Sequence, residues 1–195
     1  MIYQFKEFIP VIQESSYVHP LAAVTGNVII GKDVYIGPGA AIRGDWGQII
    51  IHDGCNIQEN CIIHMFPGTK VTLYPDAHIG HGAIIHGATI GQNCLVGMNA
   101  VIMDDVVLGD ECIVGDLTFV KANEKYENRS LIVGNPSKQI GNVTDEMISW
   151  KTKGTEIYKA LPYDMHHSFS ECKPLREIPS WYSEQEADYK PWKKK

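Results

Sequence analysis

The chain has 195 residues, 44% hydrophobic and 21% charged, with a formal net charge of −6. This composition is that of a soluble domain with a sizeable core, and it lacks the basic patches that nucleic-acid-binding proteins favour. No apolar run reaches the 18 residues of a membrane span, and the first ten residues lack the apolar core of a signal peptide, so we expect a cytoplasmic protein without nucleic-acid or membrane partners.

Aliphatic residues recur every six positions through most of residues 1–140. The series begins at Val18, Val24, Ile30, Ile36 and Ile42 and continues, after short phase breaks, at Ile51, Ile57, Ile63, Leu73, Ile79, Ile85, Ile90, Val96, Ile102, Leu108, Val114 and Val120. A period of six does not fit an α-helix and favours short parallel strands joined by tight turns, a β-solenoid. The pattern of an aliphatic residue, a glycine and a later small residue resembles the hexapeptide-repeat superfamily. That resemblance implies an all-β domain over residues 1–140, a left-handed parallel β-helix with three hexads per coil.

Four of the five cysteines occupy one position of this repeat. They are Cys55, Cys61, Cys94 and Cys112, and alanine, valine or threonine stands at the same position in other hexads. We therefore predict small buried side chains, since a free cysteine packs as a small hydrophobe. The alternative, a catalytic nucleophile, has no partner visible in the sequence. An odd count without a CxxC pair favours neither a disulfide framework nor a thiolate zinc site.

The remaining residues divide into a helical segment, 141–172, and a tail, 173–195. Apolar residues at spacings of three and four predict an amphipathic C-terminal α-helix, with Thr144 as its N-cap. Pro162 is expected to kink or split this helix. The tail is rich in proline and charge, and its tryptophans, Trp181 and Trp192, are expected to hold it against the body.

Histidines are concentrated in the segment HIGHGAIIHG, residues 78–87, and one more lies upstream in NCIIHMF. The repeat places Ile42, Ile63 and Ile85 on one face, so the residues that follow them form a column. These are Arg43, His64 and His86. Neighbouring strands lie about 4.8 Å apart, and two imidazoles at that separation are able to bind one metal ion. Polar surface residues are the alternative.

Two other histidines fall at different repeat positions. His81 belongs to the preceding face, near a corner of the prism, where it is not expected to reach the same ion within one chain. His78 stands directly before Ile79, a position from which it is expected to be a surface residue or to support a ligand rather than bind the metal.

The motifs IRGDWG, NIQENCIIH and HIGHGAIIHG resemble those of the γ-class carbonic anhydrases. The resemblance implies a homotrimer with zinc ions between subunits, each held by His64 and His86 of one chain and His81 of the next. It also makes Arg43 and Asp45 an intersubunit ion pair that organises the site, although a surface ion pair fits the sequence as well.

The same resemblance assigns candidate catalytic residues. Asn56 and Gln58 form its Asn-x-Gln motif, and Gln58 is expected to hydrogen-bond the metal-bound hydroxide. Tyr158, on the predicted helix, is a further candidate at the pocket rim, with simple packing as the alternative. Zinc is the expected cofactor, and iron or cobalt is compatible with imidazole ligands.

A narrower similarity extends over nearly the whole chain. The segments RGDWG, LVGMNAVIMD, LIVGNPSKQI and CKPLREI are similar to γ-carbonic-anhydrase-like proteins of phenylacetate degradation and of the carnitine operon. This similarity implies a zinc-dependent hydrolase of acyl-CoA thioesters that uses zinc-bound hydroxide. The substrate-binding residues stay unidentified, with Lys70 and Lys121 as candidate cations for the CoA phosphates.

Two other functions remain open, beside a purely structural or assembly role. One is carbonic anhydrase activity, but Trp46 stands where efficient enzymes of that class carry a proton-shuttling glutamate, and Asp76 is the one acid of the following loop. The other is acyl transfer, because IVGNPSK resembles a segment of hexapeptide-repeat acyltransferases. Acyl transfer leaves the three histidines unexplained, so we expect a thioesterase.

Overall fold

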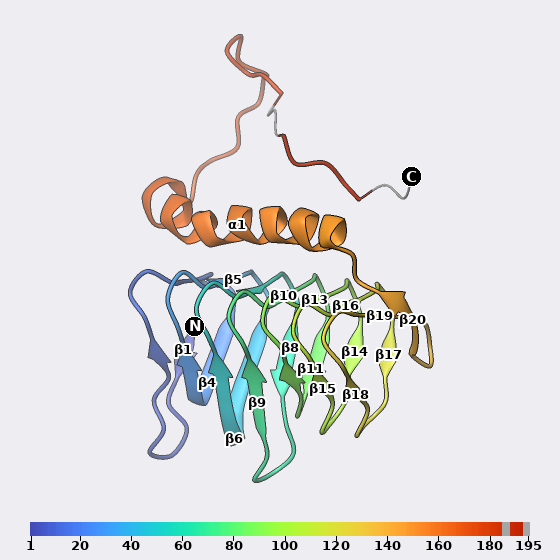
Figure 1. The fold of residues 1–195 in the computed structure, drawn as a ribbon. Coiled ribbons are helices and arrows are strands. Elements are labelled where there is room, and N and C mark those ends of the chain that lie inside the picture. The colour runs from blue at the N-terminus through green and yellow to red at the C-terminus, as the bar shows by residue number, and fades with distance from the viewer. Residues whose placement is uncertain (185–187, 193–195) are drawn as a thin grey trace.

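The computed structural model describes residues 1–184 and 188–192. It shows a parallel β-solenoid of about seven turns with one C-terminal helix lying along its side (Figure 1). The predicted parallel β-helix and its helical appendage are therefore confirmed.

Two sheets form the walls of the solenoid. The twelve-stranded sheet contains β1 (Ile2–Tyr3), β2 (Val11–Ile12), β4 (Ala23–Ile30), β6 (Ala41–Ile51), β8 (Ile62–His64), β9 (Lys70–Leu73), β11 (Ile84–His86), β12 (Thr89–Ile90), β14 (Val101–Ile102), β15 (Val107–Leu108), β17 (Phe119–Val120) and β18 (Lys125–Tyr126). The eight-stranded sheet contains β3 (Tyr17–Val18), β5 (Tyr35–Ile36), β7 (Asn56–Ile57), β10 (His78–Ile79), β13 (Leu95–Val96), β16 (Ile113–Val114), β19 (Ser130–Val133) and β20 (Lys138–Asn142).

The twelve-stranded sheet bends into two faces of the prism. The first part of β6 pairs with β8, and its last four residues pair with β9. Strand β6 therefore passes from one face to the next, and the eight-stranded sheet provides the third. This arrangement matters for the histidines, because β8 and β11 belong to one face and β10 to another.

The register follows the sequence repeat. Ile42 pairs with Ile63, and Ile63 pairs with Ile85, as the six-residue ruler predicts. These side chains are buried with the other aliphatic members of the repeat in one continuous core. The turns between strands repeatedly use an aspartate or asparagine in the left-handed region, a conformation that these residues tolerate better than most. Examples are Asp33, Asn60, Asp76, Asn93, Asn99 and Asp105.

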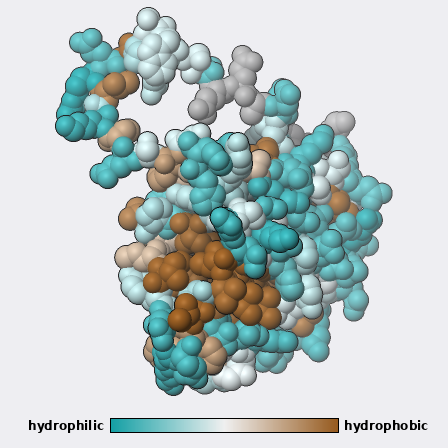
Figure 2. Space-filling model, turned by 90° about the vertical axis from the view of Figure 1, so that its left-hand side faces the viewer, coloured by the Kyte–Doolittle hydropathy of each residue, from teal (hydrophilic) through white to brown (hydrophobic). Residues whose placement is uncertain are grey.

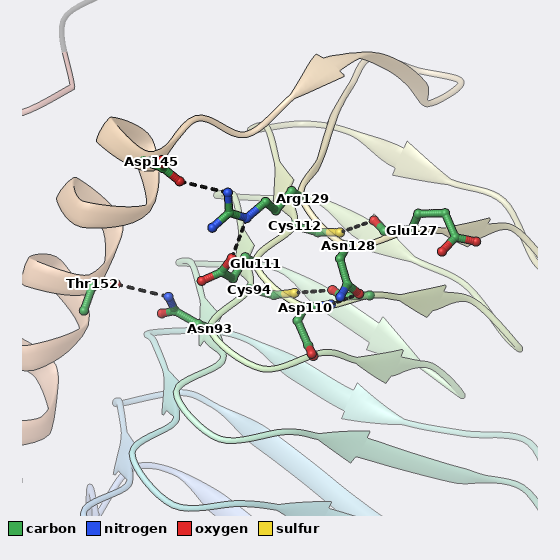
Figure 3. A network of polar contacts seen from close by, with 11 residues as sticks. Asn93, Cys94, Asp110, Glu111, Cys112, Glu127, Asn128, Arg129, Asp145 and Thr152 are labelled. Atoms are coloured by element: carbon green, nitrogen blue, oxygen red, sulfur yellow. Dashed lines mark hydrogen bonds and ion pairs between the residues drawn. The ribbon is translucent and has the colours of Figure 1, made fainter.

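The four repeat cysteines are buried, which confirms the structural interpretation. Burial raises the pKa of Cys55 to about 12 and that of Cys61 to about 11. The thiol of Cys94 donates to the carbonyl of Gly109, 3.0 Å away, and Cys112 donates to Glu127 at 3.1 Å (Figure 3). The raised pKa values of Cys55 and Cys61 keep these two thiols protonated at neutral pH, so they are poor nucleophiles.

Helix α1 (Asp145–Ser168) packs against β3, β5 and β7. Thr144 is its N-cap, as predicted, and its hydroxyl accepts from the N–H of Met147 at 3.3 Å. Pro162 does not split the helix, so that alternative is wrong, while the predicted kink stays a prediction. Pro162 lies inside α1 and is buried, so packing against the solenoid holds the helix together through the proline.

Polar contacts join α1 to the solenoid. Arg129 pairs with Glu111 at 2.7 Å and with Asp145 in the first helical turn at 2.8 Å (Figure 3). The amide of Asn93 donates to the hydroxyl of Thr152 at 3.1 Å. These contacts fix the start of the helix over the eight-stranded sheet.

The expectation for the tail tryptophans is half correct. Trp192 lies against Trp150 of α1, with ring centroids 5.8 Å apart. Trp181 is 74% exposed and packs on its neighbour Tyr182 instead.

The two ends of the solenoid differ. The antiparallel pair β19–β20 lies at one end. At the other end apolar side chains gather on the surface (Figure 2), and the exposed large apolar residues in the first coils include Ile2, Phe8, Ile9, Val11 and Leu21. Within the described residues, no helix has the length and hydropathy that crossing a membrane requires.

Candidate metal centre

His64 and His86 face each other on adjacent strands. They are register partners between β8 and β11, and their ring centroids lie 5.4 Å apart at an interplanar angle of 63°. The column predicted from the repeat is therefore present. Two imidazoles from neighbouring strands of one flat face form a pair of potential metal ligands.

Each of these rings has a carboxylate partner. Nδ1 of His86 lies 2.7 Å from Oδ1 of Asp104, and Nε2 of His64 lies 3.0 Å from Oδ1 of Asp45. A histidine that binds a metal usually donates its other ring N–H to a carboxylate, which fixes the tautomer and the ring orientation. With Asp104 on Nδ1, the nitrogen of His86 available to a metal is Nε2.

Arg43 contacts both Asp45 and His64 within one chain. Its guanidinium lies 3.0 Å from Oδ2 of Asp45 and 3.4 Å from Nδ1 of His64. The second distance is longer than an ordinary N–H hydrogen bond, and the Arg43 side chain is half exposed. Because Asp45 contacts Nε2 of His64, the ring nitrogen left for a metal is Nδ1, on the side that faces Arg43.

Two exposed aromatic rings flank the histidine pair. Trp46 packs on His64 with ring centroids 5.1 Å apart, and Phe66 contacts the edge of His86 at 5.2 Å. Both rings are about half exposed, so the rim of the site is apolar. Asp76, the acid of the following loop, pairs instead with Lys159 of α1 at 3.2 Å.

His81 lies apart from this pair, in the turn after β10. Its Nδ1 contacts the carboxylate of Glu59, which leaves Nε2 free. Within the described part of one chain, no three histidine, cysteine or acidic side chains come close enough to hold a metal ion. A single chain thus carries a two-histidine half-site on one face and a lone histidine at another corner.

A buried polar network lies beside His81, on the eight-stranded sheet. The Nε2 of Gln58 lies 3.1 Å from Oδ1 of Asn56 and 2.6 Å from Nε2 of His78. Asn56 and Gln58 are almost fully buried. Burial lowers the pKa of His78 to about 3, so its ring is neutral and accepts from Gln58. The Nδ1 of His78 and the Nδ2 of Asn56 are buried without a hydrogen-bond partner among the described residues.

Helix α1 adds two groups to this region. The ring of Tyr158 contacts His78 edge-on, with centroids 5.2 Å apart, and burial raises the pKa of its hydroxyl. Lys151 is buried, and its ammonium donates to the carbonyl of Asp76 and to Oδ1 of Asn93, both at 2.6 Å. Tyr158, Lys151, Gln58 and His81 line one pocket between α1 and the sheet.

The two lysines considered for CoA phosphates lie elsewhere. Lys70 is exposed at the start of β9 and borders a small hollow with Asp45 and Trp46. Lys121 is exposed directly after β17. Of these two lysines, Lys70 is the one near the histidine pair.

Comparison with known proteins identifies the family. The model for bacterial transferase hexapeptide (six repeats) matches residues 9–44 and 87–122. The carnitine operon protein CaiE of Escherichia coli K12 is 46% identical over 176 residues, 90% of either chain. The chain belongs to the hexapeptide-repeat transferase family. Within that family it is a CaiE-like protein.

Solved structures of the family have the same fold. A suggested acetyltransferase of Bacillus cereus is 29% identical, with a TM-score of 0.80 over 83% of this chain and 94% of that one. A hexapeptide transferase family protein of Anaplasma phagocytophilum is 28% identical, with a TM-score of 0.80 over 83% of this chain and 96% of that one. The shared fold extends well beyond the segments that the family model matches.

Proposed function

We propose that this hexapeptide-repeat protein is a metal-dependent hydrolase of acyl-CoA thioesters, linked to phenylacetate catabolism by the resemblance described above. The observation that carries the proposal is the set of three histidines, each with a carboxylate on its ring: Asp45 with His64, Glu59 with His81 and Asp104 with His86. An acyltransferase with a single histidine base needs no such set.

The donors fit a zinc ion. Imidazole nitrogens are preferred zinc ligands, and carboxylates on the opposite ring nitrogens strengthen them. Because one chain brings only two of the histidines together, we propose that a second subunit supplies His81. A homotrimer closes this arrangement with three equivalent sites. A zinc ion held by these histidines would supply an activated water at neutral pH and would polarise the thioester carbonyl.

We assign to Gln58 the role of orienting the attacking water. Its amide nitrogen has two hydrogens, and Asn56 and His78 accept both of them. Only Oε1 is left to bind another group, so Gln58 acts as an acceptor of a hydrogen bond from the water. Asn56 and His78 are positioning residues in this scheme, because they hold the amide in one orientation.

The apolar rim favours a thioester over carbon dioxide. Rapid hydration of carbon dioxide needs fast proton export, and Trp46 packs on His64 where a carboxylate would assist that export. Thioester hydrolysis has a good leaving thiolate and is expected to be slower, so exchange with buffer is sufficient.

The test is an assay of the zinc-loaded protein on acyl-CoA thioesters and on carbon dioxide, with wild type and Trp46→Glu. We expect thioester cleavage by wild type, and faster carbon dioxide hydration in Trp46→Glu without a gain in thioesterase activity. Rapid hydration by wild type with no thioester cleavage would make the protein an anhydrase. Transfer of the acyl group to an added amine, with no dependence on metal, would make it an acyltransferase.

A further inference from the structure

A pocket of about 580 Å³ lies between α1 and the eight-stranded sheet. Its walls are mainly apolar and include Leu95, Met98, Ile157 and Leu161. Pockets of a few hundred Å³ with apolar walls and a few converging polar groups are typical binding sites for small molecules. This volume exceeds what an acetyl group fills.

The polar groups of the pocket are those of the candidate site. His81 and Gln58 belong to its lining, and His78 and Lys151 lie beside them. The Nδ1 of His78 is buried and has no hydrogen-bond partner among the described residues. A ligand in this pocket would therefore have its apolar body under α1 and its polar end next to a proposed metal ligand.

The C-terminal tail forms one wall. Tyr189 stacks on Trp150 with ring centroids 5.7 Å apart, and Trp150 donates to the carbonyl of Lys190 at 2.9 Å. The Tyr189 hydroxyl lies against Gly154, where an added Cβ would come within 2.6 Å of its oxygen. Glycine inside a helix costs about 1 kcal/mol relative to alanine, and the close approach of Tyr189 explains its presence here.

We propose that this pocket binds the acyl group of the thioester, and that this group is apolar and larger than acetyl. The proposal rests on the thioesterase function proposed above, because it places the thioester carbonyl beside His81 and Gln58. The acyl chain then extends along Leu95 and Ile157 towards Tyr189 of the tail.

The test fills the pocket from the sheet side. Leu95 precedes the buried Val96 of β13, and its side chain lies in the pocket. Val107 holds the same repeat position in β15, on a face that does not contribute to this pocket, and gives the matched control Val107→Trp. With hexanoyl-CoA and phenylacetyl-CoA, we expect Leu95→Trp to raise KM about tenfold or more. The zinc content of Leu95→Trp, and the hydrolysis of both thioesters by Val107→Trp, should stay within about twofold of wild type.

A binding measurement separates this proposal from the proposed function. Saturation-transfer NMR with hexanoate and phenylacetate detects occupation of the pocket without any turnover. We expect a signal from wild type and Val107→Trp and none from Leu95→Trp. Ile157→Trp, which fills the pocket from α1, replaces Leu95→Trp if that variant does not fold.

The outcomes are distinct. Binding of the acids without hydrolysis of any thioester would leave the pocket assignment standing and overturn the thioesterase. Hydrolysis of acetyl-CoA and longer thioesters with equal efficiency, unaffected by Leu95→Trp and Ile157→Trp, would overturn the pocket assignment alone.

Discussion

The face that carries His64 and His86 and the face under α1 are built from the same repeat, yet they expose different chemistry. On the first face, flat strands present two imidazoles, the buried His64 and the partly exposed His86, between the exposed rings of Trp46 and Phe66. On the second, a helix covers the strands and encloses an apolar pocket with buried polar groups. The difference teaches that the repeat supplies ligand spacing, whereas the helix supplies a binding cavity. We infer that the first face supplies two of the metal ligands, and that the second face supplies the third, His81, and positions the substrate.

The largest effect that separates the two faces is expected at Gln58. Substitution Gln58→Ala should lower kcat by about 10²-fold or more while zinc content stays unchanged, because an orienting hydrogen bond is lost and no ligand is touched. The readouts are steady-state kinetics and metal analysis of the same preparation. Gln48→Ala is the control, since the Gln48 amide contacts Asn27 on another face. Loss of zinc in Gln58→Ala would show that Gln58 contributes to metal binding and would contradict its role as an orienting residue alone.

A second substitution, Asp104→Asn, is expected to affect only the face that carries His64 and His86. Asp104→Asn should weaken zinc binding about 10- to 100-fold, because His86 loses the carboxylate that orients its ring. Competition with a chelator measures the affinity. Asp110→Asn alters an acid that accepts from the backbone N–H of Gln92 and should leave the affinity unchanged. Equal affinity in Asp104→Asn and wild type would remove this carboxylate from the site.

The pH dependence of the unfolding free energy should reveal the buried His78 on the face under α1. The folded pKa of His78 is about 3, well below its ordinary value of 6.5, so the unfolded chain binds the extra proton first. The free energy of unfolding should therefore fall as the pH falls from about 6.5 towards 3. His78→Gln should reduce this slope. Lys151 and His81 face the same region, so urea unfolding is compared in a metal-free His81→Ala background. An unchanged slope would contradict a buried neutral His78.

The smallest effect is expected for the buried cysteines of the repeat, which both faces share. Cys94→Ala and Cys112→Ala should keep full activity on the substrate that the wild type cleaves, and each should cost about 1 kcal/mol of unfolding free energy. Alanine already occupies the same repeat position elsewhere. Kinetics and thermal unfolding check this pair of expectations. A folded variant without activity would make that thiol a nucleophile.

The sequence predicted the solenoid because its repeat is local and periodic, so counting hexads was enough to align Ile42, Ile63 and Ile85. The same counting could have predicted the contact between Asp104 and His86, because Asp104 stands 18 residues after His86, in the next coil. It could not have found the Glu59 contact with His81, because a loop breaks the phase between them. Lys151 was also missed, since the packing of a helix on a solenoid depends on contacts remote in sequence.

The helix shows the limit of local rules. A proline inside a helix usually breaks it, but burial of Pro162 against the sheet outweighs the local preference. The role of Gly154 depends on Tyr189, 35 residues later, and no short-range pattern predicts that contact.

The most direct test of the account is subunit mixing. His81→Ala and His86→Ala should each fold and lose most zinc and activity, because every site needs both residues. In a trimer with shared sites, mixed assemblies contain one complete site in three. Three quarters of randomly assembled trimers are mixed, so equal co-expression should restore about a quarter of the wild-type zinc and turnover. No recovery in mixed trimers, or full zinc in either variant alone, would contradict a site shared between subunits.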